Sequence, residues 1–214
     1  MFVKLKNTFD DLIYTKVPGL ESFAGLDGKG VYHNKIWSPD IDRIYSVIPK
    51  KYHEDFYLTI MTINSVLLPH RDNDLISTIN FYVKAGKCKT AFYKEKPGAQ
   101  IWQPENVITR PKSKLEVDTE VKLVKAVYDV EDVEEIDNFI AKDGDAWLLD
   151  VNEIHNVVPL EEFTERRAIA LRTKKYSYIE VYDMLKETGN VVWKIRRSEE
   201  HTSELQSRGL ISYA

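Results

Sequence analysis

The segment LLPHRDNDLISTINFYV, residues 67–83, decides how the rest of the chain is interpreted, because it joins a charged cluster to a strand. Its second half, residues 75–83, alternates between two sets of positions, as a strand with two different faces does. One face carries Thr78, Asn80 and Tyr82, and the other carries Ile79, Phe81 and Val83. We therefore predict a strand that faces apolar core on one side and lines a polar cavity on the other.

An imidazole and a carboxylate stand two positions apart just before this strand. Residues two apart in an extended chain point to the same side, so His70 and Asp72 face one way. A second imidazole, His155, follows another strand-like segment, AWLLDV. Two imidazoles and one carboxylate can occupy one face of an octahedral iron and leave three positions open for substrates. These three residues are therefore the candidate metal ligands.

Other interpretations of the cluster stay open. His70 and Asp72 could form only a polar turn after Pro69, since the pair alone has little specificity. Asp74 could replace Asp72 as a ligand, although a spacing of four from His70 suits an extended chain less well. We expect structural positions, on the surface or in the core, for His33, His53, Trp102 and Trp147.

Two adjacent arginines occur in ERRAIALRT, residues 165–173. In a strand, Arg166 and the small Ala168 share one face, and Arg167 lies on the other. An arginine beside a small residue has room to hold a carboxylate through two parallel hydrogen bonds. A shift of the strand register by one residue would give this role to Arg167.

The order of these motifs resembles that of the 2-oxoglutarate/Fe(II)-dependent dioxygenases, and most closely their small viral and bacterial, prolyl-hydroxylase-like members. The matching motifs are H-x-D, NFYV, TAFY, GDAWLLD followed by HNV, and R-x-A-I, all within residues 56–173. The resemblance implies that Fe(II) is bound by His70, Asp72 and His155. It also implies that Arg166 holds the distal carboxylate of the cosubstrate 2-oxoglutarate, and the doubled arginine departs from the family's pattern.

Three residues of the strand at residues 75–83 complete the implied cosubstrate site. Tyr82 falls where these hydroxylases place a tyrosine that hydrogen-bonds the same carboxylate. Thr78 and Asn80 share its face, and a purely structural role is the alternative for these two residues. The implied fold is mainly β, a double-stranded β-helix of the cupin type, or jelly roll, with flanking α-helices. The implied reaction uses O2 and hydroxylates a substrate with release of succinate and CO2.

The substrate does not follow from the sequence: a protein side chain, a small molecule and a nucleobase are all open. The rival hypothesis is a non-catalytic, cupin-like binding or structural module. A cupin with another metal and no cosubstrate is a further option. Neither rival needs a buried arginine facing the metal, so Arg166 is the residue that separates the hypotheses.

The composition is that of a globular protein with one domain, which we place at residues 1–196 with a core at about 56–175. A net charge of -4 gives no strong signal for nucleic-acid binding. Cys88 is the only cysteine, which excludes an intrachain disulfide and favours a cytoplasmic location. The family resemblance implies that this is the cytoplasm of a bacterium or of a virus-infected host cell. No apolar run approaches the length that a membrane span requires.

The C-terminal segment, residues 197–214, has the sequence RSEEHTSELQSRGLISYA and resembles a translated sequencing adapter. Residues 197–207 and 211–214 match the two fixed parts of the adapter, and the variable index of the adapter lies between them. We therefore expect it to be non-native and to contribute nothing to the fold. A natural polar tail is the alternative.

The remaining patterns predict further elements of secondary structure. Strands are expected at residues 56–68, 89–94, 121–130, 146–151 and 167–173. Ser38 is the expected N-cap of a short helix. Ser177 and Glu180 predict a capping box at the start of a longer helix, and Gly189 predicts its end. Residues 131–145 are ambiguous, with a helical turn as one interpretation.

Overall fold

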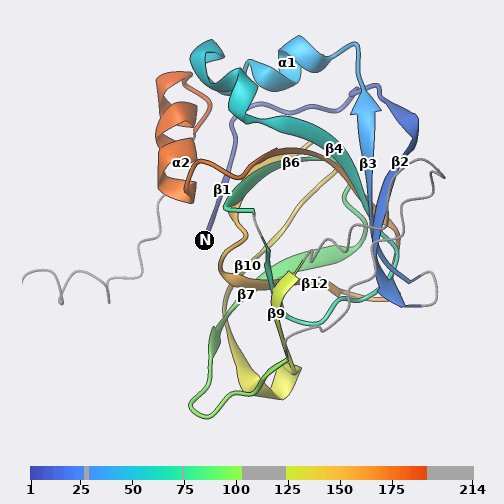
Figure 1. Ribbon diagram of the computed structural model, residues 1–214, viewed down its shortest axis with the longest axis vertical. Coiled ribbons are helices and arrows are strands. Elements are labelled where there is room, and N and C mark those ends of the chain that lie inside the picture. The colour runs from blue at the N-terminus through green and yellow to red at the C-terminus, as the bar shows by residue number, and fades with distance from the viewer. Residues whose placement is uncertain (27–28, 74, 103–123, 192–214) are drawn as a thin grey trace, which may run out of the picture.

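The structure is a computed structural model that describes residues 1–26, 29–73, 75–102 and 124–191. Two antiparallel sheets, of seven and six strands, make up most of this part of the chain, with few helices (Figure 1). The prediction of a mainly β protein is thus confirmed. Asp74 and the segment 197–214 lie outside the described residues.

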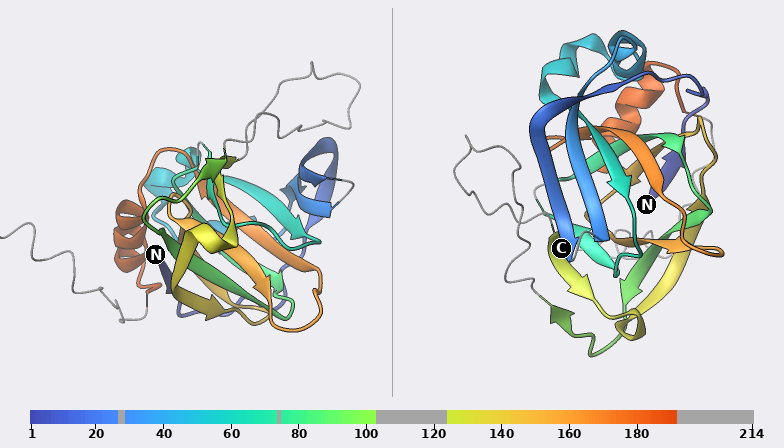
Figure 2. Two further views of the ribbon diagram at one scale, coloured as in Figure 1. Left: turned by 90° about the horizontal axis from the view of Figure 1, so that it is seen from below. Right: turned by 90° about the vertical axis from the view of Figure 1, so that its right-hand side faces the viewer.

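The seven-stranded sheet is built around strands from distant parts of the sequence. In spatial order its strands are β1 (Phe2–Lys4), β11 (Ala146–Asp150), β6 (Ser77–Lys84), β13 (Arg166–Thr173), β4 (Tyr57–Ile63), β3 (Lys29–Trp37) and β2 (Thr15–Leu26). The central strand β13 pairs with both β6 and β4. Strands β2 and β3 continue the sheet past the end of the other sheet (Figure 2).

The six-stranded sheet contains the segment whose sequence pattern is ambiguous. Its strands are, in spatial order, β10 (Val133–Ile140), β7 (Cys88–Glu95), β12 (Ile154–Pro159), β5 (His70–Asp72), β9 (Val124–Tyr128) and β8 (Ile101–Trp102). The helical interpretation of residues 131–145 is wrong, because most of the segment is strand β10, preceded by the 3-10 turn Val130–Asp132. This strand lies at the sheet edge and most of its side chains are exposed, so it lacks the alternation that identifies a half-buried strand.

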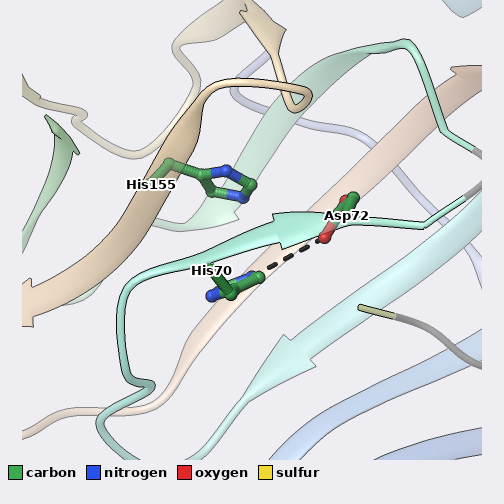
Figure 3. A group of neighbouring side chains, drawn as sticks. All are labelled: His70, Asp72 and His155. Carbon is green, nitrogen blue, oxygen red and sulfur yellow. Dashed lines mark ion pairs between the residues drawn. The ribbon is translucent and has the colours of Figure 1, made fainter. Parts of the chain in front are cut away.

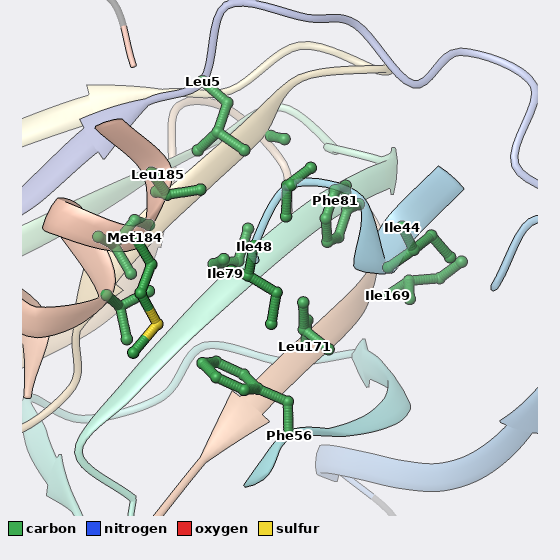
Figure 4. Close-up of a cluster of buried hydrophobic side chains, with 14 of the residues drawn as sticks. Leu5, Ile44, Ile48, Phe56, Ile79, Phe81, Ile169, Leu171, Met184 and Leu185 are labelled. Carbon is green, nitrogen blue, oxygen red and sulfur yellow. The ribbon is translucent and has the colours of Figure 1, made fainter. Parts of the chain in front are cut away.

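The helices cover the face of the seven-stranded sheet that points away from the other sheet (Figure 1). They are α1 (Ile41–Tyr45), the 3-10 helix η1 (Lys50–Asp55) and α2 (Tyr178–Glu187). The main apolar core lies between these helices and the sheet (Figure 4). No helix in the described ranges is long and apolar enough to cross a membrane.

The helix ends were predicted with different success. The capping box of α2 is confirmed: the Glu180 backbone donates to Ser177 Oγ, and the Ser177 backbone donates to the Glu180 carboxylate. Gly189 follows this helix with a φ of 73°, as a C-terminal stop requires. The prediction for Ser38 is wrong, because helix α1 begins later, after Asp40; Ser38 Oγ instead accepts a hydrogen bond from the Asp40 backbone.

Alternation along β6 and β13 gives the central strands two chemically different faces. Ile79 and Phe81 of β6, with Ile169 of β13, point into the core beneath the helices. The polar residues Thr78 and Asn80 point to the opposite side, where the second sheet lies. The two faces are those that the sequence pattern predicts, and the functional candidates lie on the second one.

Candidate metal centre and pocket

Strand pairing brings the two distant imidazoles together. His70 on β5 lies directly opposite His155 on β12, and directly opposed residues of antiparallel strands project from the same face. The two ring centroids are 4.6 Å apart. Asp72 follows on the same strand as His70, and its carboxylate turns toward the rings (Figure 3).

The three side chains each present one ligand atom, and these atoms all lie within 4.8 Å of one another. His70 Nδ1 is 2.8 Å from the Leu68 carbonyl oxygen, and His155 Nδ1 is 2.9 Å from the Glu153 carbonyl oxygen. A carbonyl oxygen only accepts, so each Nδ1 carries the proton. The lone pair of each ring therefore lies on Nε2, as in histidines whose other nitrogen is fixed by a second partner.

The surroundings keep His155 neutral at ordinary pH. Burial lowers its pKa from 6.5 to about 4, and repulsion from His70 acts in the same direction. Asp72 Oδ1 lies 3.6 Å from His70 Nε2. A neutral imidazole and a nearby carboxylate form a donor set that suits a divalent cation.

The cluster lies at the wall of a cavity of about 260 Å³ between the two sheets. The lining includes Thr78, Asn80 and Tyr82 of β6, as well as Thr90 of β7 and Val157 of β12. Thr78 Oγ1 donates to Asn80 Oδ1 at 3.1 Å, so part of the polar wall is internally bonded.

Arg166 points into this cavity and is only 1% exposed. One of its terminal nitrogens, Nη1, donates to Thr90 Oγ1 at 2.9 Å, and the guanidinium lies 4.4 Å from the centroid of the Tyr82 ring. Its Nε and Nη2 are buried and have no hydrogen-bond partner. A buried donor without a partner costs about 1–3 kcal/mol, which makes this arrangement unusual unless a ligand completes it.

Arg167 points the other way. Its guanidinium forms an ion pair with the Glu165 carboxylate at 2.6 Å and remains partly exposed. The register of β13, in which Ala168 lies opposite Met61 of β4, therefore puts Arg166 and not Arg167 on the cavity side.

Several residues of the lining were not predicted as site residues from the sequence, and two of them, Arg172 and His33, carry groups that can be charged. Arg172 lies six residues after Arg166 on β13, and residues an even number apart in a strand point to the same face. This spacing is the signal that could have identified Arg172. His33 was expected in a structural position but lines the cavity, which could not be foreseen because β3 reaches it only through its pairing with β4.

The remaining residues that were expected in structural positions have different surroundings. His53 lies in helix η1, where its Nε2 is 3.1 Å from the Ile48 carbonyl oxygen. Trp147 stacks on Phe139 with ring centroids 4.1 Å apart, is partly buried and packs against an apolar cluster. The Trp102 side chain is outside the described part of the structure.

Comparison with known proteins adds little to this geometry. No family model matches the sequence, and no curated protein matches it. Among solved structures, the chain is similar to the X-ray structure of E. coli ycfD, with 12% identity and a TM-score of 0.39. The match covers 94% of this chain but 56% of that one, so the chain spans little more than half the length of ycfD. A similarity at this level supports no conclusion about fold or activity.

Proposed function

We propose that this protein is an Fe(II)- and 2-oxoglutarate-dependent oxygenase that hydroxylates its substrate with release of succinate and CO2. The observation that carries the proposal is the presence, in one cavity, of a possible three-ligand metal site and a buried arginine with two unpartnered donors. A cluster of two histidines and an aspartate also occurs in polar turns, and a buried arginine also occurs in structural ion pairs. Together, the two features match the needs of a metal ion and of a carboxylate that is bound beside it.

The donor set fits iron(II). His70, Asp72 and His155 would hold the ion through two Nε2 atoms and one carboxylate oxygen, since both Nδ1 atoms are engaged with carbonyl groups. Three protein ligands on one side leave the remaining positions for exchangeable ligands. Zinc sites of the structural kind are instead closed by four protein ligands, and the described cluster has three.

The arginine fits a carboxylate. Arg166 Nε and Nη2 are the adjacent donors that a bidentate carboxylate would accept from, and Thr90 and Tyr82 hold the guanidinium from the other sides. Iron with 2-oxoglutarate and O2 would supply the oxidising chemistry. The chain itself would orient the distal carboxylate of the cosubstrate through Arg166, while the apolar lining residues Leu75 and Val157 would exclude water.

The order of the strands supports a double-stranded β-helix, or jelly roll. Four pairs nest within one another along the chain: β4 with β13, β5 with β12, β6 with β11, and β7 with β10. Successive pairs alternate between the two sheets. A long hairpin rolled up in this way produces the eight-stranded arrangement of jelly rolls.

The rival hypothesis of a binding or structural module gives no account of Arg166. A roll stabilised only by packing gains nothing from a buried cation with two unpartnered donors, because such a group costs free energy in the folded protein. The cavity-facing arginine therefore favours the enzyme over the module.

The test is reconstitution of the protein with Fe(II) under anaerobic conditions, followed by titration of 2-oxoglutarate and then by admission of O2. We expect saturable binding of 2-oxoglutarate that requires the metal, and slow release of succinate in the absence of a substrate. A protein that binds Fe(II) but not 2-oxoglutarate would favour a cupin with another reaction. A protein that binds neither would favour the structural module.

A further inference from the structure

A second buried arginine faces the cavity at the other end of β13. Arg172 lies six residues from Arg166 on the same face of the strand, a separation of about 20 Å along an extended chain. It is 9% exposed, and its Nε is buried without a hydrogen-bond partner. The two arginines therefore serve different parts of the cavity.

The neighbours of Arg172 satisfy only part of the hydrogen-bonding capacity of its guanidinium. Nη1 lies 3.1 Å from His33 Nδ1, which accepts the hydrogen bond as a neutral imidazole. Burial and the neighbouring guanidinium both lower the pKa of His33 well below its usual value, which keeps the ring uncharged. Nη2 lies 3.7 Å from Asp72 Oδ2, a carboxylate that also faces His70.

The balance of charge in the cavity leaves a surplus near Arg172. Among the described residues of the lining, Asp72 is the only carboxylate, against two buried cations, Arg166 and Arg172. A divalent metal ion and the doubly charged 2-oxoglutarate would cancel each other. An anion bound at Arg172 would compensate the remaining positive charge, which is costly in a site shielded from water.

Polar and aromatic groups surround this end of the cavity. On the neighbouring strand β4, Tyr57 lies directly opposite Arg172, and Thr59 is the next residue on the cavity side. Thr59 Oγ1 is buried and has no hydrogen-bond partner, so it is a second group that a ligand could satisfy. Tyr57 is partly exposed and offers a ring at the mouth of the cavity.

We propose that Arg172 and Thr59 form an anion subsite, next to the metal centre, that binds a carboxylate or phosphate group of the primary substrate. This inference rests on the proposed function for its assignment to the substrate and not to the cosubstrate. If Arg172 only held Asp72 in place, it would use only its Nη2. Arg172 Nε and Thr59 Oγ1 would then remain buried without a hydrogen-bond partner. A small substrate or a side chain with one anionic group would satisfy all of them.

The test compares small probes that differ in charge but little in shape. The protein is loaded anaerobically with Mn(II) and 2-oxoglutarate, and benzoate, phenyl phosphate and benzamide are titrated by calorimetry. We expect one of the two anions to bind at least tenfold more tightly than the neutral benzamide. Preference for benzoate would identify a carboxylate, and preference for phenyl phosphate would identify a phosphate. Equal affinity of all three probes would overturn the proposal.

Variants locate the binding site. Arg172→Gln should abolish the preference for the anion, Arg172→Lys should retain part of it, and Arg167→Gln, on the opposite face, should leave it unchanged. Thr59→Val should weaken binding of the preferred anion several-fold without changing the charge of the site. Retention of the full preference in Arg172→Gln would overturn the proposal, as would loss of bound 2-oxoglutarate when the anion is added.

The outcomes separate this proposal from the proposed function. If the protein binds neither Mn(II) nor 2-oxoglutarate, the proposed function fails, and the same probes on the metal-free protein still test whether Arg172 binds anions. If 2-oxoglutarate binds in an Arg166-dependent manner while no probe prefers Arg172, the proposed function stands and the anion subsite is refuted.

Discussion

Replacing Arg166 by methionine should lower the affinity for 2-oxoglutarate without lowering the stability of the fold. The methionine side chain is unbranched and two atoms shorter, and it carries no charge and no donor. Arg166 Nε and Nη2 are free to donate two charge-assisted hydrogen bonds to the distal carboxylate. Such bonds contribute about 1.5–3 kcal/mol each. The loss of both should raise the dissociation constant of 2-oxoglutarate at least about a hundredfold, since each 1.4 kcal/mol is about tenfold.

The same substitution should not destabilise the protein without its cosubstrate. It removes two buried donors that lack partners, each costing about 1–3 kcal/mol. It also removes one hydrogen bond to Thr90 and the contact with the Tyr82 ring, worth about 1–3 kcal/mol together. The difference lies between a loss of about 1 and a gain of about 5 kcal/mol, so we expect an unfolding free energy raised by about 2 kcal/mol.

Two measurements check both parts: anaerobic calorimetry of 2-oxoglutarate with Fe(II) bound, and urea denaturation of the metal-free protein. Arg167→Met is the matched control and should keep cosubstrate affinity, because its side chain lies on the other face. Arg166→Lys should bind 2-oxoglutarate weakly, since an ammonium lacks the planar fork. A variant Arg166→Met that unfolds easily but binds 2-oxoglutarate normally would refute the reasoning and make the arginine structural.

Three further substitutions test the metal ligands, the buried imidazole and a tight turn. His155→Ala should lower the affinity for Mn(II) at least tenfold, measured by electron paramagnetic resonance, whereas His53→Ala, remote from the cluster, should not change it. The pKa of His155 is about 4 in the folded protein against 6.5 unfolded, so the metal-free protein should lose up to about 3 kcal/mol of stability as the pH falls from 6.5 to 4. A His155→Gln variant should lack this part of the pH dependence, and an unchanged profile in urea denaturation would contradict the burial argument. Gly144→Ala should destabilise the fold more than Gly189→Ala. Both glycines have a positive φ, but a Cβ would collide with a neighbour, Asp10, only at Gly144. Equal melting temperatures for the two variants would count against this.

Local periodicity was sufficient for the central strands and insufficient at the edges. The alternation in residues 75–83 predicted both faces of β6, because one face is buried in apolar core and the other in a polar cavity. Strand β10 was missed because its acidic side chains are exposed on both sides, and an edge strand needs no apolar stripe.

The part of the candidate site that depends on residues close together in the sequence could be predicted. The shared direction of His70 and Asp72 follows from a separation of two residues in a strand. The approach of His155 depends on pairing between β5 and β12, and only the order of the motifs indicated it. His33 joins the cavity through β3, and no pattern in the sequence places that strand beside β4. Contacts of this kind depend on tertiary pairing, which periodicity does not encode.

The pairing of the first strand has a consequence for synthesis of the chain on the ribosome. In β1, Phe2 lies opposite Leu149 of β11, and the Asp150 backbone donates to the Met1 carbonyl oxygen. Almost 150 residues must therefore be translated before β1 finds its partner, which takes roughly 7–30 s at about 5–20 residues per second. During this time the nascent chain exposes unpaired backbone and the apolar side chains of β1, so a chaperone that binds extended segments should associate with it co-translationally.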